Sequence, residues 1–329
     1  MTRRGWLLAA AAGAARGGEL PAVKSARPTD VKDIVVRSSL DGDPQHAWFL
    51  PPKGAAAAPV LVHLHSWSAH YDHSGEIEVA VAECAARGWA FVSPDFRGPN
   101  DRPQACASPL AIQDVLDAVA QVRKISRIDA RRIYLLGGSG GGHMTLMMAQ
   151  AEANLWAAAT AWVPITDLAA WHAFSKQQGS RYAAMLERCC GGRPGSSAAV
   201  DAEYRSRSPL FHLARAAGLP IDIEVGIHDG HKGAVPVSQS LLAFNALAAA
   251  NGQLAKQLSA AEIDFITREE KLPPALTSEP AKEKNRKRPV LFRRSAGPVR
   301  ITIFDGGHET DFRTAVQWLE SQQRTKPGS

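Results

Sequence analysis

The chain has 329 residues, of which 45% are hydrophobic and 21% are charged. This is the composition of a globular protein, and it argues against a chain that is disordered throughout. The formal net charge of +6 has a local source, because residues 282–300 hold eight basic side chains and one acidic side chain. That segment alone carries +7, and the rest of the chain is near −1.

Basic runs of this kind can mark nucleic-acid-binding patches. Residues 282–300 contain no interleaved aromatic pattern, and the chain contains no motif of a nucleic-acid-binding module. We therefore expect a solvated loop and no nucleic-acid partner. A lid segment that contacts an acidic substrate is a third interpretation of the same residues.

The N-terminal residues have the pattern of an export signal. Arg3 and Arg4 precede a short apolar run, and residues 12–14 offer the small side chains of a cleavage site. The sequence Thr-Arg-Arg-x-aromatic-Leu looks like a twin-arginine signal. We expect residues 1–30 to be an export signal and linker, so that the protein is periplasmic or secreted; the alternative is a cytoplasmic protein. No apolar stretch reaches the about 20 residues of a membrane-spanning helix, and no membrane span is expected.

Strand and helix patterns alternate along most of the chain, which predicts a single α/β domain over residues 31–322. Residues 31–39 and 46–50 are expected to form opening antiparallel strands. Further strands are predicted within residues 59–65, 89–92, 133–137, 157–163, 221–227 and 299–304. Helices are predicted over residues 76–87, 111–122 and 236–250, with a closing helix that includes Phe312 and Leu319. We expect a mostly parallel central sheet with helices on its faces.

Two segments interrupt this alternation. Residues 166–217 are rich in helix formers, tryptophan and glycine–proline breaks, and they are predicted to form a cap over the active site. Residues 253–298 form a long insertion before the last strand, and an insertion of this length is expected to be functional or partly disordered.

The most informative motif is Gly-Gly-Ser-Gly-Gly at residues 137–141, where an apolar strand ends and a helix begins. Gly137, Ser139 and Gly141 match the G-x-S-x-G nucleophile elbow, in which a tight turn exposes the serine hydroxyl. A phosphate-binding loop would need a Gly-Lys-Ser/Thr ending, which is absent here. A dinucleotide-binding turn would need an acidic residue about 20 positions later, and none is there. Ser139 is therefore the candidate nucleophile.

A serine nucleophile needs a base and an acid, which follow it in the order acid and then histidine in this type of fold. Asp229 lies just past the strand-like residues 221–227, and His308 follows the strand 299–304 and a Gly-Gly turn. We predict that His308 is the base and that Asp229 orients it. Asp167 is the alternative acid, and His143, four residues after the serine, is the weaker candidate for the base.

The oxyanion of the reaction needs two backbone N–H donors. One donor belongs to the residue after the nucleophile, Gly140. The other comes from the loop after the strand at residues 59–65, where Trp67 is the candidate. The Trp67 side chain is equally a candidate wall of the pocket.

Five ordered blocks resemble the catalytic domain of the prolyl oligopeptidase family, within the α/β-hydrolase superfamily. They are the His-Ser-Trp-Ser, Pro-Asp-Phe-Arg-Gly, Gly-Gly-Ser-Gly-Gly, Gly-Ile-His-Asp-Gly and Asp-Gly-Gly-His sequences that begin at residues 65, 94, 137, 226 and 305. The resemblance spans residues 35–319 and implies the α/β-hydrolase fold and serine hydrolase activity. It implies no metal or organic cofactor.

Two departures from the family pattern affect the substrate prediction. The family's peptidases usually have His-Gly-Gly at the oxyanion loop, whereas this chain has His-Ser-Trp from residue 65. Only about 30 residues precede the first strand, whereas a propeller domain needs at least four four-stranded blades. We expect a hydrolase of esters, carboxyl or carbohydrate, with short peptides as the alternative substrate. A non-catalytic binding protein on the same fold is the alternative of another class.

The chain has four cysteines, Cys84, Cys106, Cys189 and Cys190, and their spacing matches no zinc site. Cys84 is expected to be buried in a helix. In an oxidising compartment Cys106 could bridge to Cys189 or to Cys190. The sequence does not distinguish these two pairings.

Overall fold

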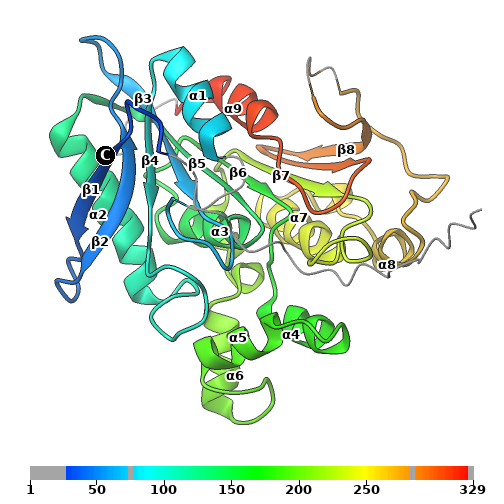
Figure 1. Ribbon diagram of the computed structural model, residues 1–329. Helices are drawn as coiled ribbons and strands as arrows, with labels where there is room; N and C mark the ends of the chain where they lie inside the picture. Colours follow the sequence, from blue (N-terminus) through cyan, green and yellow to red (C-terminus); the bar gives the residue numbers. More distant parts are fainter. Residues whose placement is uncertain (1–26, 73–76, 282, 284–285, 325–329) are drawn as a thin grey trace, which may run out of the picture.

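The computed structural model describes residues 27–72, 77–281, 283 and 286–324 (Figure 1). Within these residues nine strands form one sheet in the order β1-β2-β4-β3-β5-β6-β7-β9-β8. The strands are β1 (Lys32–Arg37), β2 (Pro44–Leu50), β3 (Ala58–Leu64), β4 (Ala90–Pro94), β5 (Ile128–Gly138), β6 (Ala158–Trp162), β7 (Ile221–Gly226), β8 (Val290–Ala296) and β9 (Val299–Phe304). Neighbouring strands from β4 to β9 are parallel, whereas β1, β2 and β8 pair in the antiparallel sense.

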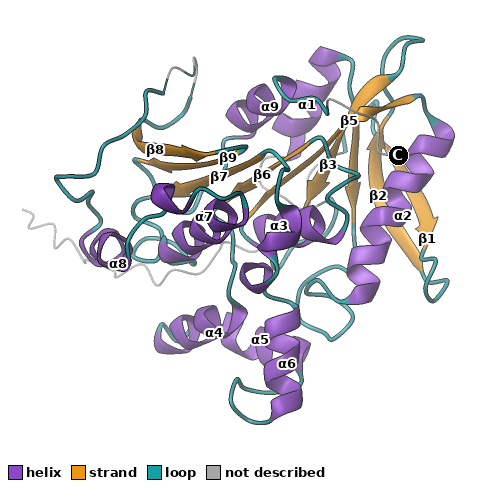
Figure 2. Ribbon diagram, turned by 180° about the vertical axis from the view of Figure 1, so that it is seen from behind, coloured by secondary structure: helices purple, strands orange, loops and turns teal. Residues whose placement is uncertain are grey.

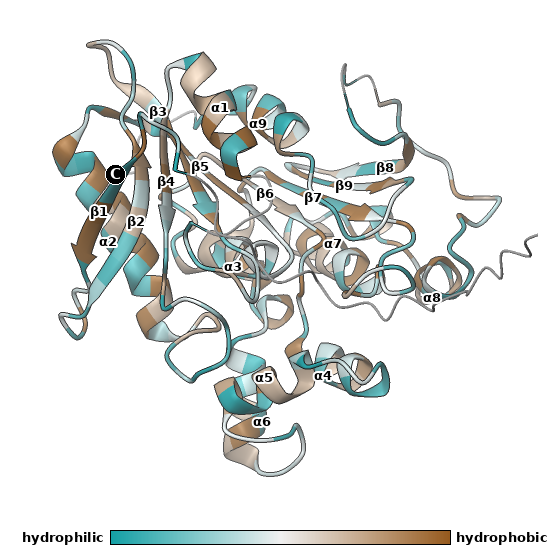
Figure 3. Ribbon diagram, in the orientation of Figure 1, coloured by the Kyte–Doolittle hydropathy of each residue, from teal (hydrophilic) through white to brown (hydrophobic). Residues whose placement is uncertain are grey.

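The central strands are buried over nearly their whole length. Every residue of β3, β6 and β7 is buried, as is typical of parallel strands that are covered on both faces. Figure 3 shows hydrophobic colouring along these strands. The opening antiparallel strands and the mostly parallel sheet confirm the predicted α/β-hydrolase fold.

Helices cover both faces of the sheet (Figures 1 and 2). Helices α1 and α9 pack together on one face, and α2, α3 and α7 lie on the other. The helices are α1 (Ile77–Arg87), α2 (Pro109–Ile125), α3 (Gly140–Ala151), α4 (Leu168–Gln177), α5 (Tyr182–Cys190), α6 (Ala198–Ser206), α7 (Ser238–Ala250), α8 (Ala260–Glu269) and α9 (Phe312–Glu320), with short 3₁₀ turns η1 (Pro209–Phe211), η2 (Leu213–Ala216) and η3 (Leu254–Lys256). Ser108 caps α2 by accepting the N–H of Ala111, and Pro109 opens the helix.

Helices α4, α5 and α6 lie apart from the sheet in both views (Figures 1 and 2). They belong to the segment predicted to be a cap, residues 166–217. Their apolar side chains form a cluster separate from the main core, and this cluster includes Trp67, Trp171, Tyr182 and Leu186. The cap helices therefore pack on the loop that follows β3, and through it on the end of the sheet where β5 and α3 meet.

The expectation of a solvated basic loop at residues 282–300 was wrong. This stretch contains β8, an edge strand that pairs with β9, and three of its five arginines, Arg286, Arg293 and Arg300, face inward. The side chains of Arg286 and Arg293 are each 6% exposed, and that of Arg300 is 17% exposed.

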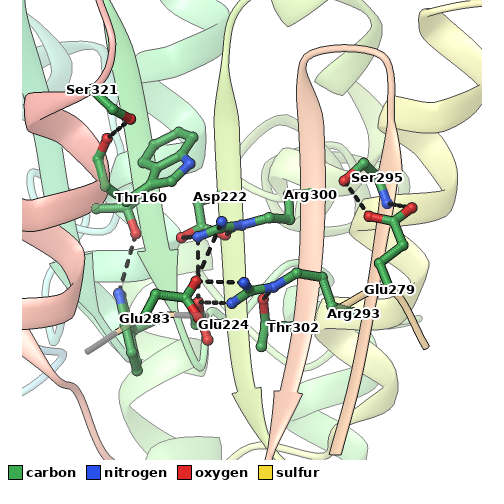
Figure 4. Close-up of polar contacts among 12 residues, drawn as sticks. Thr160, Asp222, Glu224, Glu279, Glu283, Arg293, Ser295, Arg300, Thr302 and Ser321 are labelled. Carbon is green, nitrogen blue, oxygen red and sulfur yellow. Dashed lines mark hydrogen bonds and ion pairs between the residues drawn. The ribbon is translucent and has the colours of Figure 1, made fainter. Parts of the chain in front are cut away.

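The partners of these arginines are Asp222 and Glu224 on strand β7 and Glu283 from the insertion, and Figure 4 shows these carboxylates around Arg293 and Arg300. Asp222 accepts two hydrogen bonds from Arg300, each 2.8 Å long. Glu224, two residues further on the same face of the strand, is fully buried and binds Arg286 through both oxygens. Glu283 from the insertion binds Arg293. Three carboxylates thus offset three of the eight basic side chains in residues 282–300.

The expected export signal at the N-terminus lies outside the described residues, and it remains a prediction. Within the described residues, no helix combines the length and the apolar character needed to cross a bilayer.

We expect Arg286→Met to lower the free energy of unfolding by about 3–5 kcal/mol, because it removes the nearest cation from the buried carboxylate of Glu224 and leaves only Arg293 and Arg300, at 3.9 and 3.8 Å. Adding Glu224→Gln to the same chain should restore part of that loss. Urea unfolding would measure both changes. The matched control is Arg268→Met, which breaks an exposed pair with Asp264 and should cost no more than about 0.5 kcal/mol. Equal costs for the two arginine variants would contradict this account.

Candidate active site

Ser139 occupies the sharp turn between β5 and α3. Its backbone has φ 58° and ψ −121°, a conformation that costs energy for a residue with a side chain. The turn also brings backbone segments unusually close, since a Cβ built on Gly141 would lie 2.0 Å from the carbonyl oxygen of Leu64. Only glycine fits at Gly141, which explains why the serine needs glycine neighbours. The strand–turn–helix context that the G-x-S-x-G motif requires is present.

Helix α3 begins directly after Ser139, so its free N–H groups and its dipole face the region of the serine. Ser139 itself is 7% exposed. Its N–H donates to the carbonyl of Trp162 on β6 (2.9 Å), which fixes the turn against the neighbouring strand.

Asp229 and His308 lie on loops that follow the adjacent parallel strands β7 and β9. His308 Nδ1 and Asp229 Oδ2 are 2.7 Å apart, and the carboxylate of Asp229 is buried. The other oxygen of Asp229 accepts the N–H groups of Gly230 (3.0 Å) and Val235 (3.2 Å). These bonds hold the carboxylate in the orientation that an acid beside a histidine needs.

The loop that carries His308 reaches the turn at Ser139. A Cβ built on Gly138, the residue before the serine, would lie 2.2 Å from Oγ1 of Thr310, two residues after His308. The sheet order places β6 and β7 between β5 and β9, and the loop after β9 bridges this gap. The structure therefore brings the predicted nucleophile, base and acid to one end of the sheet.

Trp67 and Gly140, the predicted oxyanion donors, are in direct contact. A Cβ on Gly140 would lie 2.3 Å from the backbone nitrogen of Trp67. Two N–H groups from different loops thus approach the start of α3, which is the arrangement that binds an oxyanion.

His65 holds the loop that contains Trp67, a role the sequence analysis did not assign. Its ring nitrogens lie 3.0 Å from the carbonyl oxygen of Ser66 and 2.8 Å from that of Asp95. The ring stacks on Phe96 with 3.9 Å between centroids. Burial lowers the pKa of His65. The only sequence signal was its place in the His-Ser-Trp block.

The two alternative candidates have other contacts. Asp167 caps α4, since its Oδ1 accepts the N–H groups of Ala169 and Ala170, each at 3.0 Å. His143 is fully buried, and its Nε2 lies 2.7 Å from the carbonyl oxygen of Arg207. Burial lowers the pKa of His143 to about 4, so this imidazole stays neutral near pH 7. The contacts favour Asp229 and His308 as the acid and the base.

A second group of polar side chains surrounds the loop that carries Asp229. His228 Nδ1 lies 2.6 Å from Glu270, at the end of α8, and His228 Nε2 lies 3.5 Å from Asp305. This contact links Asp305, in the turn before His308, to the loop that carries Asp229. Among the described residues, no group of three or more His, Cys, Asp or Glu side chains is arranged to hold a metal ion.

Comparison with known proteins gives one family match. The model of the prolyl oligopeptidase family matches residues 76–262, more than half of the chain. A search of curated proteins finds no match.

Solved structures share the fold at low sequence identity. The uncomplexed acylaminoacyl peptidase of Pyrococcus horikoshii has a TM-score of 0.62 at 18% identity, over 91% of this chain and 43% of that one. A puromycin-hydrolyzing peptidase of Mycobacterium tuberculosis has a TM-score of 0.54 at 19% identity, over 73% of this chain and 38% of that one. An acetyl xylan esterase from Paenibacillus sp. R4 has a TM-score of 0.55 at 18% identity, over 92% of this chain and 87% of that one. The chain spans less than half the length of the two peptidases.

The two candidate acids can be separated by a pair of matched variants. Asp229→Asn should lower kcat by about ten-thousand-fold, because an amide cannot stabilise a charged imidazole. Asp167→Asn should keep most of the activity and lose at most about 1 kcal/mol of stability through the weakened helix cap. Steady-state kinetics and thermal unfolding of both variants would measure this. The reverse ranking of kcat would make Asp167 the acid.

Proposed function

Because the chain belongs to the prolyl oligopeptidase family and is a serine hydrolase, we propose that it hydrolyses esters of small acyl groups on carbohydrate or other alcohols. The family match confirms the resemblance seen in the five motif blocks. It also favours an enzyme over a non-catalytic binding protein. The observation that carries the proposed site is the convergence of Ser139, the His308–Asp229 pair and the Trp67 N–H at one end of the sheet.

In this proposal Ser139 attacks the carbonyl carbon of the ester while His308 accepts the proton of the serine. The charge on the carbonyl oxygen is stabilised by the N–H groups of Gly140 and Trp67 and by the start of α3. Asp229 orients His308 and stabilises its charged form. His308 then protonates the departing alcohol, and an acyl group remains on Ser139. Water, activated by His308, releases the acid and restores the serine.

The preference for small acyl groups rests on the side chain of Trp67. Trp67 is 1% exposed and contacts Trp171 of the cap edge-to-face, with 4.7 Å between ring centroids. Trp171 in turn lies 5.0 Å from Tyr182 and donates its indole N–H to the carbonyl of Ala234, on the loop that carries Asp229. This aromatic wall occupies space beside the oxyanion donors, where the family's peptidases usually have glycine.

A short-peptide substrate is the second candidate. It is supported by the family, and by the two peptidases that share the fold. The ester proposal is supported by the acetyl xylan esterase, which this chain matches over most of the length of both proteins. Both substrates would use the same triad and differ only in the leaving group.

A panel of substrates tests the proposal. We expect turnover of nitrophenyl acetate and of acetylated xylan, a rate at least tenfold lower for nitrophenyl octanoate, and none for an acylaminoacyl anilide. Ser139→Ala is the blank for each substrate, and its circular dichroism spectrum should match that of the wild type. Cleavage of the anilide at a rate comparable with that of the acetate would instead establish a peptidase. Equal rates for acetate and octanoate would contradict the role of Trp67.

A further inference from the structure

Glu270 follows helix α8 in a backbone conformation that is unusual for a residue with a side chain. Its φ of 52° and ψ of 33° lie in the left-handed region, which glycine adopts most readily. The helix before it is well anchored, since Ile263 and Ile266 are buried in the main core and α8 lies beside α7 (Figures 1 and 2). A strained position on a rigid element points to a role for the side chain that it presents.

The carboxylate of Glu270 faces two histidines of the loop that carries Asp229. Its Oε2 lies 2.6 Å from His228 Nδ1, and its Oε1 lies 3.7 Å from His231 Nδ1. The hydrogen bond with His228 lowers the pKa of Glu270, so this group is a carboxylate near pH 7. The other ring nitrogen of His231 lies 2.7 Å from the carbonyl oxygen of Thr267, in the last turn of α8. The end of α8 thus binds this loop through both histidines.

His228 extends these contacts to the loop that carries His308. Its Nε2 lies 3.5 Å from Oδ1 of Asp305, and its backbone N–H donates to the carbonyl of Gly306 (3.0 Å). Asp305 and Gly306 lie three and two residues before His308, and His228 directly precedes Asp229. One residue therefore contacts both α8 and the loop of the candidate base, and its backbone continues into the candidate acid.

These contacts differ from those that orient the carboxylate of Asp229. The N–H groups of Gly230 and Val235 come from the same loop as Asp229, so they orient the carboxylate within that loop. The contacts of His228 hold the loop itself against α8 and against the loop of His308. The 2.7 Å contact between Asp229 and His308 depends on how the two loops lie. A displacement of about 1 Å in such a pair can lower the rate about a hundredfold.

We propose that Glu270 is a positioning residue, which holds the loops of Asp229 and His308 together through His228. Glu270 acts on these loops and not on the substrate. The inference rests on the proposed triad, and it does not depend on the choice between ester and peptide substrates. It also gives a function to part of the insertion at residues 253–298, whose length led us to expect one.

Substitution of Glu270 tests this role. Glu270→Ala should lower kcat for nitrophenyl acetate by roughly ten- to a hundredfold and leave KM within about twofold. The rate of fluorophosphonate labelling at Ser139, which needs no substrate, should fall by a similar factor. A purely structural contact would change the melting temperature alone, so kcat is expressed per Ser139 that is finally labelled.

Two further variants serve as the rescue and the control. Glu270→Gln keeps an oxygen that accepts a hydrogen bond from His228 Nδ1, and it should recover most of the activity. Glu269→Ala removes the same charge from the exposed neighbouring residue, and it should keep the wild-type kcat.

A double variant shows whether Glu270 acts through His228. His228→Ala alone should lower kcat about as much as Glu270→Ala, and the combination should lower it no further than either change alone. Additive losses in the double variant, or equal kcat and labelling rates in the wild type and Glu270→Ala, would overturn the positioning role alone. Absence of labelling at Ser139 in the wild-type protein would overturn the proposed triad and the positioning role with it.

Discussion

The turn at Ser139 depends on backbone contacts that leave no space for side chains. The serine is held with a positive φ, and Gly140 and Gly141 lie against the loop that follows β3. The same contact that closes the turn brings the Trp67 N–H to the start of α3. The candidate nucleophile and the candidate oxyanion donors are thus positioned by one packing arrangement, and the strain is offset by the buried strands on either side. His65 supports this arrangement from behind, through two carbonyl groups and Phe96.

Buried ion pairs between arginines and carboxylates lie near the edge of the sheet that β8 forms. Asp222 and Glu224 on β7 would be costly to bury alone, and Arg286, Arg293 and Arg300 compensate them. Figure 4 shows Arg293 and Arg300 beside the two carboxylates. The charge-assisted bonds fix β8 and the preceding insertion next to β7 and β9, which carry the loops of Asp229 and His308. The basic segment thus has a structural role at the edge from which the acid and base loops extend.

Most of the fold and the candidate site could be predicted from the sequence, because motif order and strand ends carry that information. Ser139, Asp229 and His308 each follow a strand, and parallel strands bring their carboxyl ends to one edge. Strand β8 was not predicted, because arginines in a sequence are typical of a polar loop. These arginines are buried because they pair with carboxylates on β7, a strand some 70 residues earlier in the chain. The ring contacts of His65 and the helix-capping role of Asp167 also emerge only in three dimensions.

Covalent labelling tests the central claim, that the His308–Asp229 pair activates Ser139, most directly. The protein is treated with a fluorophosphonate, digested, and analysed by peptide mass spectrometry beside its His308→Ala variant. The account predicts one added phosphonyl group on the peptide that contains Ser139, with labelling at least a hundredfold slower in the variant. Labelling at another residue, or an equal rate in both proteins, would contradict it.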